Sequence, residues 1–189
     1  IQGGYTEKER VDGTATLNLK INEANSLELE GGRAEHDNER TAKSGSPSEM
    51  NNIRTHYGLT HTLRWGERFE TRSYVIDEEV EIENGSVESA YTSTLANTKT
   101  VLPLANQTMT LGAEYKWETT DHDASRFYGR ANNLELERWQ RALFIEDEYY
   151  VTDDLSVTGG LRYDENEHYG EELIPRLYAV YRMTDAWVL

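Results

Sequence analysis

The chain has 189 residues, only 37% of them hydrophobic, with a formal net charge of −16 at pH 7 and a mean hydropathy of −0.79. This composition argues against an ordinary soluble core, because apolar burial has to offset the entropy of ordering the backbone. Twelve tyrosines and four tryptophans exclude disorder, the absence of cysteine excludes disulfides and thiolate metal sites, and no apolar run reaches the length of a transmembrane helix.

The first half of the chain alternates apolar and polar residues in a way that predicts five β-strands. These strands are expected at Gly13 to Ile21, around Leu27 and Leu29, at Tyr57 to Trp65, at Phe69 to Ile82 and at Ala90 to Leu102. Tight turns are expected at Asn22 to Asn25 and at Gly66-Glu67, and polar loops at His36 to Asn52 and around Asn84-Gly85.

The second half predicts four more strands, which gives an antiparallel meander of about nine. They are expected at Thr108 to Glu118, at Trp139 to Val151, at Leu155 to Glu165 and at Ile174 to Met183. Short turns at Pro103 to Asn106 and Asp153-Asp154 separate them from long loops at Thr119 to Glu137 and Asn166 to Glu172. Trp187-Val188-Leu189 is typical of the start of a further strand.

The period of two also assigns side chains to the two faces of the sheet. One face should be apolar, the other small and polar. The apolar face is expected to hold Leu111, Ala113, Tyr115, Val157, Leu161 and Tyr163, and the polar face Thr110, Glu114, Lys116, Thr158 and Arg162.

The predicted turns alternate between short and long, and aromatic residues gather near both ends of the strands. Tyr115, Trp117 and Tyr163 end outward-running strands, while Trp65, Tyr149, Tyr181 and Trp187 lie near short turns. Outer-membrane barrels have short periplasmic turns, long extracellular loops and two aromatic girdles. The sequence therefore favours an all-β, up-and-down sheet that is part of an outer-membrane barrel, with its apolar face toward lipid.

Several motifs in the last third of the chain resemble those of TonB-dependent outer-membrane receptors, most of all the branch of the colicin I receptor and the ferric-catecholate receptors. They are Phe144 to Tyr149, Thr152 to Leu155, Thr158 to Asp164, Tyr169-Gly170, Ile174 to Tyr181 and Thr184 to Trp187. Ile174 and Leu177 depart from that pattern, where the family usually has Ser and Ala.

The resemblance implies a 22-stranded barrel around a globular plug that imports ferric siderophores, with energy relayed by TonB. Residues 1–189 would be part of the barrel wall, without the plug or the C-terminal closing strand. The implied location is the Gram-negative outer membrane, with the long loops extracellular. The implied partners are a ferric siderophore of the catecholate type, TonB through the plug, outer-membrane lipid and a colicin, with no cofactor and no nucleic acid.

Arg126-Phe127-Tyr128-Gly129-Arg130 is the best candidate for ligand binding. Guanidinium groups of Arg126 and Arg130 pair with anionic oxygens, and Phe127 and Tyr128 offer flat surfaces to catechol rings. The alternative is a loop packed on itself. The net charge of −16 opposes this function, because it repels an anionic chelate at long range.

Asp121-His122-Asp123 offers oxygen ligands that suit a hard divalent cation. The alternative is a solvated loop tip, since the spacing matches no calcium-loop pattern. The five histidines are scattered and no hydrolase, phosphate-loop or zinc-protease motif occurs, so an enzyme on a β-scaffold is the least favoured interpretation.

A self-contained soluble β-sheet protein, either a binder or an adhesin, stays open as the alternative to a receptor segment. Cut free from a membrane, nine strands with open edges should cover their apolar face by folding over or by pairing with a second copy. A monomer in light scattering, with its apolar face accessible to quenchers, would contradict that expectation.

Overall fold

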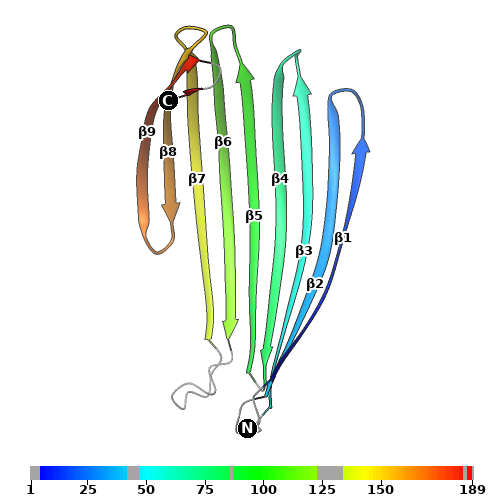
Figure 1. Cartoon of the computed structure of the whole chain (residues 1–189). Helices are drawn as coiled ribbons and strands as arrows, with labels where there is room; N and C mark the ends of the chain where they lie inside the picture. Colours follow the sequence, from blue (N-terminus) through cyan, green and yellow to red (C-terminus); the bar gives the residue numbers. More distant parts are fainter. Residues whose placement is uncertain (1–4, 42–46, 86, 123–133, 185–186, 189) are drawn as a thin grey trace.

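The computed structural model describes residues 5–41, 47–85, 87–122, 134–184 and 187–188, which form one antiparallel sheet. Its strands follow one another in chain order, so the predicted all-β up-and-down meander is confirmed (Figure 1). The strands are β1 (Tyr5–Lys20), β2 (Asn25–Thr41), β3 (Pro47–Trp65), β4 (Phe69–Asn84), β5 (Val87–Pro103), β6 (Gln107–His122), β7 (Leu134–Tyr150), β8 (Leu155–Asn166), β9 (Gly170–Thr184) and β10 (Trp187–Val188). The described residues contain no helix with the length and hydropathy to cross a membrane.

The strands are longer than predicted, always at the end opposite the short turns. β2 and β3 occupy most of the predicted loop from His36 to Asn52, and β6 and β7 shorten the predicted loop from Thr119 to Glu137 at both ends. These loop predictions were wrong in extent because polar residues continue on both faces there. The alternation disappears from the sequence while backbone pairing between the strands goes on.

All the predicted short turns lie at one end of the sheet, the upper end in Figure 1. In the turn at Gly66, the glycine has a φ of 69°, which an L side chain would disfavour. The strict alternation of short and long connections was wrong, because only residues 85–86 join β4 to β5 and residues 167–169 join β8 to β9.

The register runs from β1 to β9 without a shift, and directly opposite residues share a face. Leu111, Ile145 and Leu161 form one such row, and Ala113, Leu143 and Tyr163 form the next. Arg162 and Phe144 lie on the opposite face, together with Glu114 and Thr158. The two predicted sets of face residues are therefore confirmed.

The aromatic residues of the apolar face form two rows. The turn-side row holds Trp65, Phe69, Tyr149 and Tyr181, and the loop-side row holds Tyr57, Tyr115, Trp117, Trp139 and Tyr163. Tyr57 and Trp65 are eight residues apart, which is about 27 Å along a strand. A strand tilt of about 40° reduces this to roughly 21 Å, close to the apolar band of an outer-membrane barrel.

The polar face is the concave, inner face of the sheet. The described residues that are most enclosed all lie on it: Thr158 is 2% exposed, Ala142 3% and Glu118 8%. Side chains converge on the concave side of a curved sheet and spread on the convex side. The apolar outer face accordingly carries exposed side chains such as Leu17 and Leu143, as expected of a surface that lipid covers.

A charge placed on the outer face should reduce the stability of the barrel far more than the same charge at the next residue, which points to the inner face. Leu111→Arg in the whole protein is expected to lower the free energy of unfolding from a bilayer by about 2–4 kcal/mol, because Leu111 lies between the two aromatic rows. Thr110→Arg is the matched control, since Thr110 points to the inner face. Denaturant titration in lipid vesicles measures both; a larger loss for Thr110→Arg would contradict the assigned faces.

Candidate functional site on the inner wall

The inner face holds nearly all the cations of the sheet. Thirteen of the fifteen arginines and lysines in β1 to β9 lie on it, with eleven carboxylates, whereas the outer face has two cations and seventeen carboxylates. The thirteen are Lys8, Arg10, Lys20, Arg40, Arg54, Arg64, Arg72, Lys99, Lys116, Arg138, Arg162, Arg176 and Arg182.

The negative charge of the chain is therefore carried by the outer face, the turns and the loops. The inner wall is close to neutral, with a slight excess of positive charge. An anionic ligand inside the barrel would not meet the repulsion that the net charge of −16 suggests, because nearby charges dominate the local potential.

A cluster around Glu118 joins three strands near the loop end of the inner wall. The Glu118 carboxylate accepts hydrogen bonds from Tyr91 on β5 and from Arg138 Nε on β7, the latter at 2.5 Å, and pairs with Lys116 Nζ at 2.7 Å. The carboxylate is buried and fully engaged. It fixes the ends of β6 and β7, between which residues 123–133 run.

These contacts also set the acidity of Glu118. It lies one residue past Trp117 of the loop-side aromatic row, outside the membrane band. The hydrogen bond from Arg138 lowers its pKa most, those from Lys116 and Tyr91 lower it further, and burial opposes them, so the pKa is about 2 instead of 4.5. Glu118 is thus a constant negative centre of the wall.

A second cluster surrounds Arg162 on the same face, nearer the short-turn end. Arg162 Nη2 contacts Glu114 Oε1 at 3.1 Å, its Nε donates to Asp164 at 2.9 Å, and its guanidinium lies 5.8 Å from the centre of the Phe144 ring. Glu114 also accepts a hydrogen bond from Asn97 Nδ2 at 3.2 Å. The cluster links β5, β6, β7 and β8 through one guanidinium.

Gly112 makes room for this arrangement. The Phe144 ring lies directly over it, and a Cβ at position 112 would come within 3 Å of the ring and of the Thr98 carbonyl oxygen. Any larger residue would have to displace Phe144, against which Arg162 stacks.

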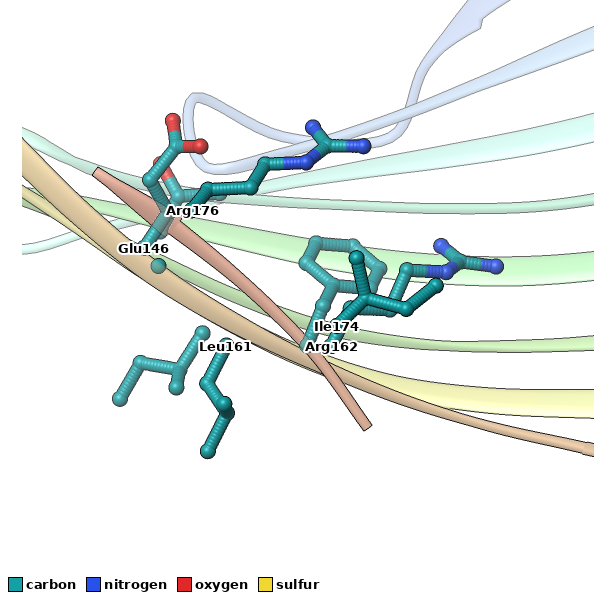
Figure 2. Close-up of a pocket in the computed structure, with 9 residues that line it drawn as sticks. Glu146, Leu161, Arg162, Ile174 and Arg176 are labelled. Carbon is teal, nitrogen blue, oxygen red and sulfur yellow. The ribbon is translucent and has the colours of Figure 1, made fainter. Parts of the chain in front are cut away.

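A small pocket of about 230 Å³ opens beside Arg162. Figure 2 shows Glu146, Arg162, Ile174 and Arg176 on one side of the ribbon and Leu161 on the other, as the register requires. Ligand pockets usually exceed 300 Å³. This one fits a carboxylate or a side chain, not a whole metal chelate.

A larger hollow, about 780 Å³, lies on the outer face around Tyr57, Gly31 and Ala15. Its lining is mostly apolar, with Leu17 and Leu59 beside it. Lipid would cover this surface in a membrane, so it is no candidate for a polar ligand.

The residues predicted for ligand and metal binding are only partly described by the structure. Arg126, Phe127, Tyr128, Arg130 and Asp123 lie outside the described residues. Asp121 and His122 belong to the end of β6, where they point to opposite faces and are not brought together. His122 is hydrogen-bonded to Ser89, and within the described chain no group of three His, Asp or Glu could hold a metal ion.

Sequence analysis missed the clusters around Glu118 and Arg162. Each joins residues from three or four strands, and without the register their contacts cannot be read from spacing alone. The sequence did contain a signal. Within each strand nearly all arginines and lysines are an even number of residues apart, which places them on one face of the sheet.

Comparison with known proteins identifies the same architecture. The family model described as TonB dependent receptor-like, beta-barrel matches residues 2–189. An iron-regulated outer membrane virulence protein of Vibrio cholerae serotype O1 is 28% identical over 199 residues, which cover 100% of this chain and 30% of that protein.

Two solved structures share the fold. The siderophore receptor PirA of Pseudomonas aeruginosa has a TM-score of 0.81 and 20% identity, covering 94% of this chain and 31% of PirA. A mutant ferric enterobactin receptor of the same organism, in complex with enterobactin, has a TM-score of 0.76 and 18% identity, covering 95% of this chain and 32% of the receptor. This chain thus spans under a third of these proteins.

Filling the space above Gly112 should disturb the Arg162 cluster. Gly112→Ala in the whole protein is expected to cost about 1–3 kcal/mol of stability, because the new methyl group overlaps the Phe144 ring and a backbone oxygen. Gly159→Ala is the control, since nothing lies within 4 Å of that position. Denaturant unfolding in detergent measures both, and equal costs would contradict the packing over Gly112.

The Glu118 cluster should lose its stabilising effect in acid. The pKa of Glu118 is about 2 in the folded protein and 4.5 ordinarily. The stabilisation by the ionised Glu118 is therefore complete above pH 4.5 and is lost as the pH falls toward 2. Glu118→Gln should therefore be less stable than wild type at pH 7 and equally stable below pH 2. Unfolding curves across that range test this, with Glu137→Gln on the outer face as control; a difference independent of pH would refute it.

Proposed function

The chain belongs to the TonB-dependent receptor β-barrel family of the outer membrane. We propose that the whole protein, of whose barrel wall this chain is a part, imports a ferric siderophore. Energy for import would reach the barrel through TonB, and lipid would cover the outer face. The protein would bind and transport its cargo without changing it chemically. A role as colicin receptor stays a prediction.

The division of charge between the two faces carries this proposal. Ferric catecholates are anionic, and an inner wall whose thirteen cations slightly outnumber its eleven carboxylates can pass an anion that the whole chain would repel. The seventeen outer carboxylates lie on the far side of the sheet and do not line the path. A catecholate is thus the favoured class of cargo.

The loop between β6 and β7 is the proposed first contact for the cargo. Arg126 and Arg130 would pair with catecholate oxygens, and Phe127 and Tyr128 would contact the rings. Support comes from its place in the chain, because the Glu118 cluster anchors the two strands from which this loop departs.

Uptake of an iron-labelled catecholate by iron-starved cells that carry the whole receptor tests the function. Replacing Arg126 and Arg130 by Gln is expected to lower uptake at least tenfold, since each lost charge-assisted hydrogen bond costs about 1.5–3 kcal/mol. Arg33→Gln is the control, because Arg33 lies on the outer face.

The choice of cargo is tested in parallel with a ferric hydroxamate that bears no negative charge. Preferential uptake of the hydroxamate would overturn the catecholate assignment while leaving siderophore import intact. No TonB-dependent uptake of any ferric siderophore would overturn the proposed function itself.

A further inference from the structure

One carboxylate of the outer face lies inside the apolar band. Asp147 on β7 is directly opposite Gly159 on β8, in the part of the outer face that lipid covers. Of the seventeen outer carboxylates in β1 to β9, Asp147 is the only one on the short-turn side of the row that contains Leu111. The two outer cations of these strands, Arg33 and Arg141, are both on the loop side of that row.

The Asp147 carboxylate has no partner in the sheet. Its Oδ1 atom is enclosed and makes no hydrogen bond within the described chain, although the side chain as a whole is only half-buried. Asp147 is two residues from Tyr149 of the turn-side aromatic row, which is about 7 Å along the strand or roughly 5 Å in depth at a tilt of about 40°. Aromatic girdles lie at the level of the lipid headgroups. Asp147 therefore lies just on the hydrocarbon side of the headgroups, where water does not solvate it as it solvates the charges of the inner wall.

The outer surface beside Asp147 is hollow. A Cβ added at Gly159 would meet nothing within 4 Å, so a notch lies directly next to the carboxylate. Leu177 of β9, which is 80% exposed, stands on the far side of this notch. Toward the centre of the membrane the notch continues along β7 and β8 into an apolar hollow of about 240 Å³, lined by Leu143, Phe144, Ile145, Leu161 and Tyr163. Notch and hollow together form a groove with a carboxylate at one end and apolar walls at the other.

We propose that this groove binds a phospholipid with a primary ammonium head, phosphatidylethanolamine, from the inner leaflet of the outer membrane. The short turns of outer-membrane barrels face the periplasm, which assigns Asp147 to that leaflet. The lipid ammonium would donate charge-assisted hydrogen bonds to the Asp147 carboxylate. One acyl chain would lie over Gly159 and then in the hollow between Ile145 and Leu161.

The charges around the groove select this head over other common ones. A choline head is cationic but has no N–H group to donate, and an anionic lipid such as phosphatidylglycerol is repelled by the carboxylate. Gln107, on the outer face directly opposite Tyr149, offers a neutral amide donor to the lipid phosphate. The inference rests on lipid covering the outer face, and the identity of the cargo does not enter it.

Competition between lipids tests the site. The whole receptor in detergent is incubated with equal concentrations of phosphatidylethanolamine, phosphatidylcholine and phosphatidylglycerol that carry the same acyl chains. Native mass spectrometry then counts the bound molecules of each lipid. The wild type is expected to bind phosphatidylethanolamine about fivefold more than either of the others, which is the size of effect that a half-buried, hydrogen-bonded ion pair produces.

Two variants locate the bound lipid. Asp147→Asn keeps the shape of the side chain and removes its charge, so it should bring the three lipids to parity. Gly159→Leu keeps the carboxylate and fills the notch, and should also abolish the preference, while an added leucine on the lipid-covered face leaves the barrel folded. Glu81→Gln is the matched control and should retain the full preference, because Glu81 is an outer carboxylate beyond the loop-side aromatic row.

Chemical coupling in vesicles that contain phosphatidylethanolamine tests the contact directly. A membrane-soluble carbodiimide activates the Asp147 carboxyl group, the lipid amine attacks the activated carbon, and an amide forms as the urea leaves. Peptide mass spectrometry should find Asp147 joined to the lipid and Glu81 without it.

Three results would overturn the lipid site. The first is equal binding of the three lipids by the wild type, and the second is a preference that survives Asp147→Asn or Gly159→Leu. The third is an Asp147 that couples to a lysine of another protein, or to no amine, instead of the lipid. None of these results bears on whether the receptor imports siderophore.

Discussion

An unbroken antiparallel register governs everything else in this molecule. Side chains alternate strictly, so a shift by one residue would exchange the two faces and would turn the inner cations and the inner carboxylates toward lipid. Nine strands keep their pairing from one end to the other without such a shift. The bilayer enforces this order, because charges on the lipid face are costly across the apolar band.

The same constraint removes the conflict between an acidic chain and the anionic cargo proposed for it. Net charge adds the two faces together, although the sheet keeps them apart. The outer carboxylates concentrate where strands extend past the loop-side aromatic row, as with Glu79, Glu81 and Glu83 on β4. They lie in water beyond the membrane, while the inner cations lie along the lumen.

Sequence alone predicted the parts of the fold that lie within the apolar band, and failed beyond it. Between the aromatic rows one face must be apolar. The strands that contain Leu111 and Leu161 can therefore be predicted from the alternation of apolar and polar residues. Beyond the row of Tyr57 and Trp117, toward the loop end, both faces are in water, so residues from His36 to Thr41 show no alternation although they pair with β1 and β3. The site clusters failed for another reason: Glu118 and Arg138 are twenty residues apart and meet only through the hairpin register.

Paired and unpaired charges on the inner wall affect the stability of the sheet differently. Arg138 and Arg162 are held by carboxylates of another strand and Lys116 by Glu118 of its own strand, and these ion pairs stabilise the wall. A charge without such a partner contributes nothing to the wall and weakens it where a second like charge faces it. Where such a cation is exposed, as Arg72 and Lys99 are, water solvates it and it stays available to an anion in the lumen.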